Sequence, residues 1–211
     1  MLMTMHAQDE RDPARAKGRR EEYTEATRHA LMTAGRDAFA GEGYQAAGIE
    51  AISRAARVTR GAFYHHFADK QALFDAVVMA MQQDAAQRIA ARAKAQRKIW
   101  DRLGAGIDAY LDVCLEPAYA RIVIQDAPAV LGRQRYREID AAHTLALLGA
   151  TFDALKARGE LQVDDPSLLT HMVDAMICEM AQLLPQTKDA KALRERGKAI
   201  ISRLLETYRA T

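Results

Sequence analysis

The chain has 211 residues and a mass of 23.4 kDa, which is enough for one large domain or two small ones. Its formal net charge of +2 is too small to indicate a nucleic-acid partner, so any basic surface must be local. Two cysteines, Cys114 and Cys178, cannot form a disulfide framework or a metal cage. No long apolar run and no signal peptide is present, which predicts a soluble cytoplasmic protein, and nothing indicates a cofactor.

The first stretch, residues 1–20, shows no hydrophobic periodicity and carries mixed charge, so we expect a disordered arm. Within it lies a basic run without acidic residues, formed by Arg15, Lys17, Arg19 and Arg20. Most charge runs of this kind are solvated tails, and the alternative is an arm that lies along DNA.

Three helices are predicted in residues 21–70. The first begins at Thr24, a suitable helix cap, and ends near Gly41. The second covers residues 48–56, and the third covers residues 59–67 with Thr59 as its cap. In the third helix Phe63 and Phe67 can face inward, whereas its polar, aromatic and basic residues lie on the exposed face. Such a short, capped helix after a tight turn is typical of a helix-turn-helix.

At these residues the sequence resembles the DNA-binding signature of TetR-type transcriptional regulators. The similarity covers about residues 23–78 and includes the stretch AISRAARVTRGAFYHHFADKQALFDAV. Two positions depart from the family pattern: Arg57 stands where glycine is usual, and Gly48 stands where threonine or serine is common. The resemblance implies an all-α regulator in which a helix-turn-helix domain is joined by a long helix to a bundle for ligand binding and dimerisation.

A recognition helix presents its first residues to base edges in the major groove. Arg60 can read guanine or touch a phosphate, and Gly61 allows close approach of the backbone. Tyr64 and His65 can reach a phosphate or a base, whereas His66 is expected to be structural or solvent-exposed. The turn calls for a left-handed residue, so Arg57 either accepts strain or the turn differs. The predicted DNA contacts are Thr59, Arg60, Gly61, Tyr64, His65, Lys70 and Arg57.

The remaining chain, residues 71–211, is also predicted to be helical. A helix capped by Asp69 continues to about Lys94 and would connect two regions. Further helices are expected from Ile99 to Cys114, from Tyr119 to Gln125, from Gln134 to Arg158, from Ser167 to Leu184 with Asp165 as cap, and from Ala190 to Tyr208. No β pattern and no internal repeat is visible in the sequence.

The last two helices carry more apolar surface than one bundle edge needs, which favours a homodimer, as the resemblance also implies. The predicted interface consists of Leu168, Met172, Met176, Glu179, Met180, Leu183, Ile200 and Leu204. The bundle should also enclose an apolar pocket for a small effector. Its predicted lining, of which each member could equally be plain core, is Trp100, Tyr110, Cys114, Ile122, Phe152, Leu155, Met172, Met176 and Cys178.

The function predicted from the sequence is a repressor that a small apolar ligand releases from a palindromic operator in double-stranded DNA. A TetR-like DNA-binding protein without a small ligand, architectural or partner-regulated, is the alternative. An enzyme is disfavoured, since His143, His171, Asp126 and Glu179 show no catalytic or metal-binding spacing. A thiol sensor is disfavoured because both cysteines lie on apolar helix faces.

Overall fold

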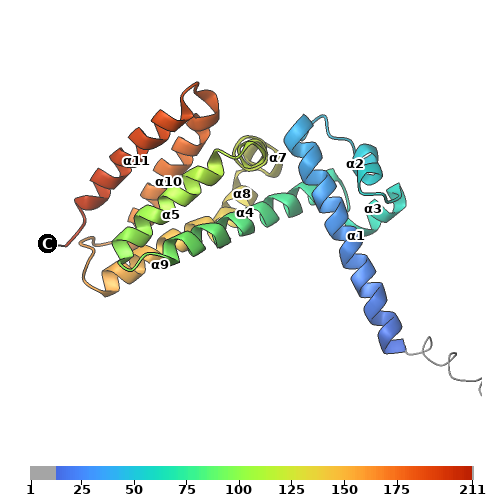
Figure 1. Ribbon diagram of the computed structural model, residues 1–211, viewed down its shortest axis with the longest axis horizontal. Coiled ribbons are helices and arrows are strands. Elements are labelled where there is room, and N and C mark those ends of the chain that lie inside the picture. The colour runs from blue at the N-terminus through green and yellow to red at the C-terminus, as the bar shows by residue number, and fades with distance from the viewer. Residues whose placement is uncertain (1–12, 211) are drawn as a thin grey trace, which may run out of the picture.

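The computed structural model describes residues 13–210, with side chains from residue 22 onward. Nearly all of this part is helical and none of it forms a β-strand; Leu161 and Arg209 make an isolated antiparallel bridge. The predicted all-α class is therefore confirmed. Figure 1 shows a small N-terminal unit and a helical bundle, with one long helix passing from the first into the second. No helix in the described range is long and apolar enough to cross a membrane.

The N-terminal unit consists of α1 (Pro13–Glu42), α2 (Ile49–Ala55) and α3 (Arg60–His66). Because α1 begins at Pro13, Thr24 lies inside the helix, and the predictions of a cap at Thr24 and of disorder up to residue 20 were wrong for residues 13–20. Residues 1–12 and the side chains of the basic run lie outside the described part. Aromatic and aliphatic side chains from all three helices and from α4 are completely buried between them: Leu31, Phe39, Ile52, Phe63, Leu73 and Phe74.

The predicted caps of three other helices are confirmed. The Thr59 hydroxyl accepts a hydrogen bond from the Ala62 N–H at 3.1 Å, and the Asp69 carboxylate accepts one from the Ala72 N–H at 2.7 Å. The Asp165 carboxylate accepts a bond from the Leu168 N–H at 2.9 Å, with Pro166 in the first turn of the same helix. Each cap satisfies one backbone N–H that the helix itself leaves free, so these starts are locally encoded.

The helix α4 (Lys70–Lys94) is the predicted connector. Its 25 residues span about 38 Å at 1.5 Å per residue. Its first half packs in the N-terminal core through Leu73 and Phe74, and its second half packs in the bundle through Ala85 and Ile89. Any tilt or shift of α4 in the bundle must therefore move part of the N-terminal core.

The bundle comprises α5 (Ile99–Cys114), α6 (Pro117–Tyr119), the π-helix η1 (Ala120–Asp126), α7 (Ala127–Leu131), α8 (Arg133–Ala142), α9 (Thr144–Ala157), α10 (Pro166–Leu183), the 3₁₀ turn η2 (Leu184–Gln186) and α11 (Ala190–Glu206). The α4 helix packs mainly on α5, and α10 packs mainly on α9. Three ion pairs tie α11 to α5: Lys198 Nζ lies 2.6 Å from Asp108, and Arg194 Nη2 lies 3.2 Å from Asp108 and 2.7 Å from Asp112.

Two helix predictions in the bundle need correction. The single helix expected from Gln134 to Arg158 is broken at His143, whose backbone angles (φ −125°, ψ −87°) lie outside the helical region, so α8 and α9 are separate. The short helix expected from Tyr119 to Gln125 is mostly a π-helix. A π-helix inserts an extra residue per turn and recurs at functional sites.

Candidate nucleic-acid interface and bundle cavity

One side of the recognition helix α3 is packed in the protein core, and the opposite side is exposed to solvent. Phe63 is completely buried and Phe67 nearly so, as predicted, and Thr59 closes the first turn. Arg60, Gly61 and His65 are exposed, and Tyr64 keeps 45% of its surface accessible. Most of the predicted contact residues of α3 thus share one open surface. Figure 1 shows α2 and α3 together on the outer side of α1.

The Arg60 side chain is positioned by contacts within the protein. Its guanidinium lies 2.9 Å from the Glu50 carboxylate of α2 and 5.7 Å from the centre of the Tyr64 ring. Both members of the ion pair are mostly exposed, so the pair contributes little stability and can be exchanged for a base or a phosphate. His66 faces partly inward; burial lowers the pKa of His66, and His65 and Arg28 lower it further, which favours the neutral imidazole.

The turn between α2 and α3 requires a left-handed residue, and Arg57 supplies it. Arg57 has φ +57°, the only positive φ of a non-glycine residue in the described range. The Val58 N–H donates to the Ser53 carbonyl and the Arg57 N–H donates to the Arg54 carbonyl, which is the Schellman pattern of helix ends. The sequence left open whether Arg57 adopts a strained left-handed backbone or the turn has another geometry, and the structure shows the strained backbone. The Arg57 side chain is exposed, two residues before Thr59, the cap of the recognition helix.

Lys70 is engaged inside the protein. Its ammonium group donates to the carbonyls of Tyr44, Gln45 and Ala47 at 2.8, 3.2 and 3.0 Å. An ammonium group has three N–H donors, so these bonds use all of them. This geometry fixes the loop between α1 and α2 to the start of α4, and we do not propose Lys70 as a phosphate contact.

A second connection joins the N-terminal unit to the bundle through η1. The Tyr44 N–H donates to the Asp126 carboxylate at 3.1 Å, and Arg121 Nη2 donates to the Glu42 carbonyl at 3.3 Å. Gly43 (φ +83°) leaves room for the Arg121 guanidinium, because a Cβ at this position would collide with it. Asp126 is thus an interdomain contact, which gives a structural role to one of the residues that had suggested an enzyme.

A cavity of about 110 Å³ lies within the bundle. Apolar residues of α4, α5, α9 and α10 form most of its wall, among them Ile89, Leu103, Ile107, Leu148 and Ile177. Five polar residues also line the cavity: Arg102, Tyr110, Thr144, Thr151 and Asp174. Burial raises the pKa of Tyr110 well above 10, so its hydroxyl stays protonated. An apolar wall with a few convergent polar groups is the usual form of a small-molecule site.

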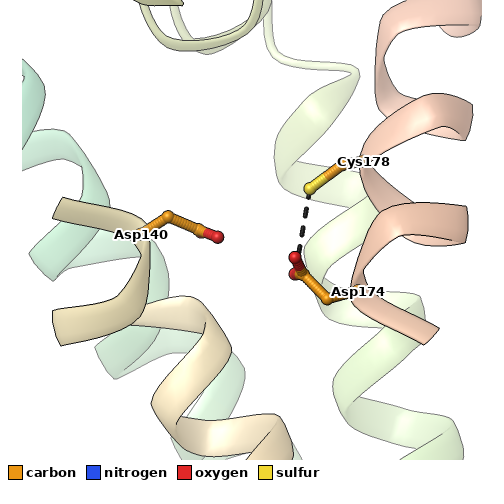
Figure 2. Close-up of side chains that lie close together, drawn as sticks. All are labelled: Asp140, Asp174 and Cys178. Carbon is orange, nitrogen blue, oxygen red and sulfur yellow. Dashed lines mark hydrogen bonds between the residues drawn. The ribbon is translucent and has the colours of Figure 1, made fainter. Parts of the chain in front are cut away.

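Two carboxylates and a thiol meet beside the cavity, and of the three only Asp174 forms part of its wall. Asp140 from α8 points across the bundle toward Asp174 and Cys178 from α10 (Figure 2), and their ligand atoms lie within 4.8 Å of one another. Burial raises the pKa of Asp140, and burial together with repulsion from Asp140 raises the pKa of Asp174 to about 6. Burial also raises the pKa of the Cys114 thiol to about 12 and raises that of Cys178, so neither is a reactive thiolate.

Of the nine residues predicted to contact a ligand, Tyr110 alone lines this cavity. Cys114, Ile122, Phe152 and Leu155 are completely buried core, whereas Met172 is largely exposed. Cys178 lies beside Asp174, and the Trp100 ring lies under the Arg209 guanidinium. Sequence analysis missed Asp140, Thr144 and Asp174. A signal existed for Asp174, because a carboxylate interrupts the otherwise apolar run from Met172 to Ile177.

An exposed apolar face runs along α10 and α11. Leu168 and Ile200 keep 57% and 63% of their surface accessible, and Met172 and Leu183 are also exposed. Met180, by contrast, is buried against Gly197 of α11, where a Cβ would collide with its sulfur. Of the predicted interface, Met180 therefore belongs to the core of the single chain, and the exposed members remain available for a second copy.

Comparison with known proteins decides the family. Residues 31–77 match the family model described as "Bacterial regulatory proteins, tetR family", and residues 100–208 match "Tetracyclin repressor-like, C-terminal domain". The chain belongs to the TetR family. It is a TetR-family transcriptional regulator with a helix-turn-helix DNA-binding fold, as the resemblance at residues 23–78 had implied.

The similarity to relatives extends over both regions of the TetR-family chain. The Transposon Tn10 TetC protein of Escherichia coli is 27% identical over 170 residues, which cover 78% of this chain and 83% of the relative. A TetR-family regulator from Pectobacterium atrosepticum is 29% identical, with a TM-score of 0.77 over 90% of this chain and 97% of that one. RolR, solved in complex with resorcinol, shares the fold (TM-score 0.69, 17% identity, 88% of this chain and 90% of that one).

Proposed function

We propose that this regulator is a homodimeric repressor that binds a palindromic operator and is released when a small ligand occupies the bundle cavity. The observation that carries the proposal is the course of α4. Ile89, Ala90 and Ala93 near its end line the cavity, and Lys70 at its start anchors the helix-turn-helix unit. The two sites are about 28 Å apart along one continuous helix, at 1.5 Å per residue from Lys70 to Ile89.

On DNA, α3 would enter the major groove with its N-terminal residues against base edges. Arg60 would leave Glu50 and donate to guanine O6 and N7, the most specific contact available to an arginine. Thr59, Tyr64 and His65 would contact the phosphates on either side, and Gly61 would let the backbone approach. Arg57 in the preceding turn would add a further phosphate contact.

A dimer would present two recognition helices to successive turns of the duplex. The exposed apolar face of α10 and α11 supports this assembly, because a monomer would leave Leu168, Met172, Leu183 and Ile200 in water. A two-fold axis through such a face creates a self-complementary contact. The expected operator is therefore palindromic, with half-site centres about 34–36 Å apart or a multiple of that distance. A role in binding chromosomal DNA would also fit the proposed location in the cytoplasm.

Ligand release would follow from coupling between the bundle and α4. Arg135 of α8 forms a two-bond ion pair with Asp75 of α4, at 2.7 and 2.9 Å, so a shift of α8 acts directly on α4 near the helix-turn-helix. A ligand that binds one bundle geometry better than the other shifts the dimer toward it, by no more than the difference in affinity. The changed spacing of the two recognition helices would then weaken operator binding.

The alternative function, DNA binding without a small ligand, predicts a fully packed bundle. The cavity favours the ligand-responsive function, although its volume of about 110 Å³ is below the roughly 300–1,000 Å³ of sites for drug-sized ligands. A correspondingly small effector is expected. No described observation favours a catalytic role.

Selection of bound duplexes from random DNA, followed by fluorescence anisotropy on the selected sequence, tests the proposal. Arg60→Ala should weaken binding at least about 10-fold and relax discrimination at one base pair of each half-site. Arg97→Ala removes the same charge in the connection between α4 and α5 and should change little. If the full-length protein ignores every duplex at low salt, or if Arg60→Ala weakens binding no more than Arg97→Ala, this account of α3 is wrong.

A further inference from the structure

We infer that the effector is a small apolar compound bearing a protonated amine, with the ammonium group held between Asp174 in the cavity wall and Asp140 behind it. This inference rests on the proposed function, because it takes the bundle cavity as the effector site. The cavity would bind the apolar body of the effector, and the two carboxylates would bind its ammonium group.

Neither carboxylate forms an ion pair within the part of the chain with described side chains. Cationic groups act on them without direct contact: His143 lowers the pKa of Asp140, and His171 and Arg137 lower that of Asp174. Asp140 is only 7% exposed, yet its one hydrogen bond comes from the Thr144 hydroxyl one turn further along the chain. Asp174 accepts a weak bond from the Cys178 thiol at 3.8 Å. One oxygen of each carboxylate has no hydrogen bond among the described residues. Figure 2 shows the Asp140 side chain directed toward Asp174 from the opposite helix.

Such an arrangement is unfavourable without a ligand. Buried carboxylates normally pair with a cation, coordinate a metal or take up a proton. Here burial and mutual repulsion both oppose ionisation, which is why the pKa of Asp174 is raised to about 6. A cation between the two groups would reverse both effects, so the site favours a positively charged ligand over a neutral or anionic one.

The spacing accommodates an ammonium group. An N–H···O contact of about 2.9 Å to each of two acceptors at the tetrahedral angle spans about 4.7 Å. The ligand atoms of Asp140, Asp174 and Cys178 lie no more than 4.8 Å from one another, so this span fits between them. Zinc–oxygen bonds of about 2.1 Å bring two ligand oxygens to about 3.4 Å, which the same limit admits. The choice between an amine and a metal therefore depends on the neighbouring cavity.

The apolar cavity provides an independent argument for an organic ligand. Asp174 and Thr144 belong to the cavity wall together with Leu103, Ile107, Leu148 and Ile177. A bare metal ion at the carboxylates would leave this apolar space empty. A ligand with an apolar body fills it while its ammonium group meets the acids. The volume of about 110 Å³ is close to that of cavities of about 150 Å³ that bind benzene, so a body of about one ring fits.

The test uses three probes that share one ring: benzylamine, benzyl alcohol and benzoate. Isothermal titration of the full-length protein without DNA should show that benzylamine binds at least about 10-fold more tightly than benzyl alcohol, with no binding of benzoate. Asp174→Asn and Asp140→Asn keep the shape and remove the charge, so each should abolish the preference for the amine. Asp153→Asn, on the exposed side of α9, is the matched control and should retain it.

Three results would overturn the inference. Benzylamine and benzyl alcohol could bind equally well, the amine preference could survive both substitutions, or zinc chloride could bind through Asp140, Asp174 and Cys178 while no amine binds at about 10 mM. The proposed function is tested separately, by DNA binding. A protein that binds benzylamine through Asp174 but binds no duplex refutes the repressor and supports the ligand class. A protein that binds its duplex but ignores every amine refutes the ligand class alone.

Discussion

Replacement of Asp174 by asparagine should stabilise the ligand-free protein at alkaline pH. In the folded state burial and repulsion from Asp140 raise the Asp174 pKa from 3.8 to about 6. Between these two values the folded state binds more protons than the unfolded state, so the contribution of Asp174 to stability falls as the pH rises through this window. About two pKa units correspond to about 3 kcal/mol. Partial solvent exposure and the coupling to Asp140 reduce this to about 1–2 kcal/mol.

The unfolding free energy of the Asp174→Asn variant should therefore exceed that of the wild type by about 1–2 kcal/mol near pH 8. The gain should vanish near pH 3, below both the folded and the unfolded pKa of Asp174, where aspartic acid and asparagine are both neutral. Urea unfolding followed by circular dichroism at both pH values measures the difference. Thermal unfolding should show a shift of about 2–6 °C in the same direction. Asp153→Asn controls for the loss of a surface charge. A gain that is independent of pH, or a wild type that is more stable near pH 8, would show that Asp174 is not a destabilised carboxylate.

Three further substitutions test other parts of the structure. Arg57→Gly relieves a left-handed backbone and should raise the unfolding free energy by about 1 kcal/mol in urea; a fall in the salt dependence of DNA binding by about 0.9 would in addition reveal a lost phosphate contact. Lys70→Met breaks three bonds to carbonyl groups, so it should lower the melting temperature and the DNA affinity while leaving the salt dependence unchanged. Ile200→Asp should yield monomers in sedimentation analysis, whereas Ser202→Asp, on another side of α11, should remain dimeric.

The helix-turn-helix could be predicted from the sequence because its signals are local. Thr59 and Asp69 cap their helices through bonds to residues three positions ahead, and Phe63 and Phe67 recur at helical spacing. The left-handed position was visible as well, since the family pattern expects glycine where this chain has Arg57. In such a segment the spacing of side chains along the chain already determines which of them meet.

Other features depend on contacts that no local pattern contains. No proline or glycine marks the break at His143, so that boundary was misplaced. The start of α1 at Pro13 did have a signal, because Asp12 followed by Pro13 is a typical helix start, and it was overlooked in the sequence. The residues predicted to contact a ligand were mostly apolar, and most of them are packed in the protein core. The acidic pair is formed by Asp140 and Asp174, which are far apart in the chain and meet only because α8 and α10 face each other across the bundle.

The structure also suggests why a small cavity can control a distant helix. The N-terminal unit is held to the bundle through the start of α4, through the Arg135–Asp75 ion pair, and through the bonds that Asp126 and Arg121 of η1 make with the end of α1. All of these contacts lie on elements that pack against one another in the described bundle. Because packed cores switch between discrete arrangements, a ligand-induced change of α8 relative to α10 would, in the proposed mechanism, be passed on as a rigid-body movement. The strength of that response would be limited by the difference in the ligand's affinity for the two arrangements.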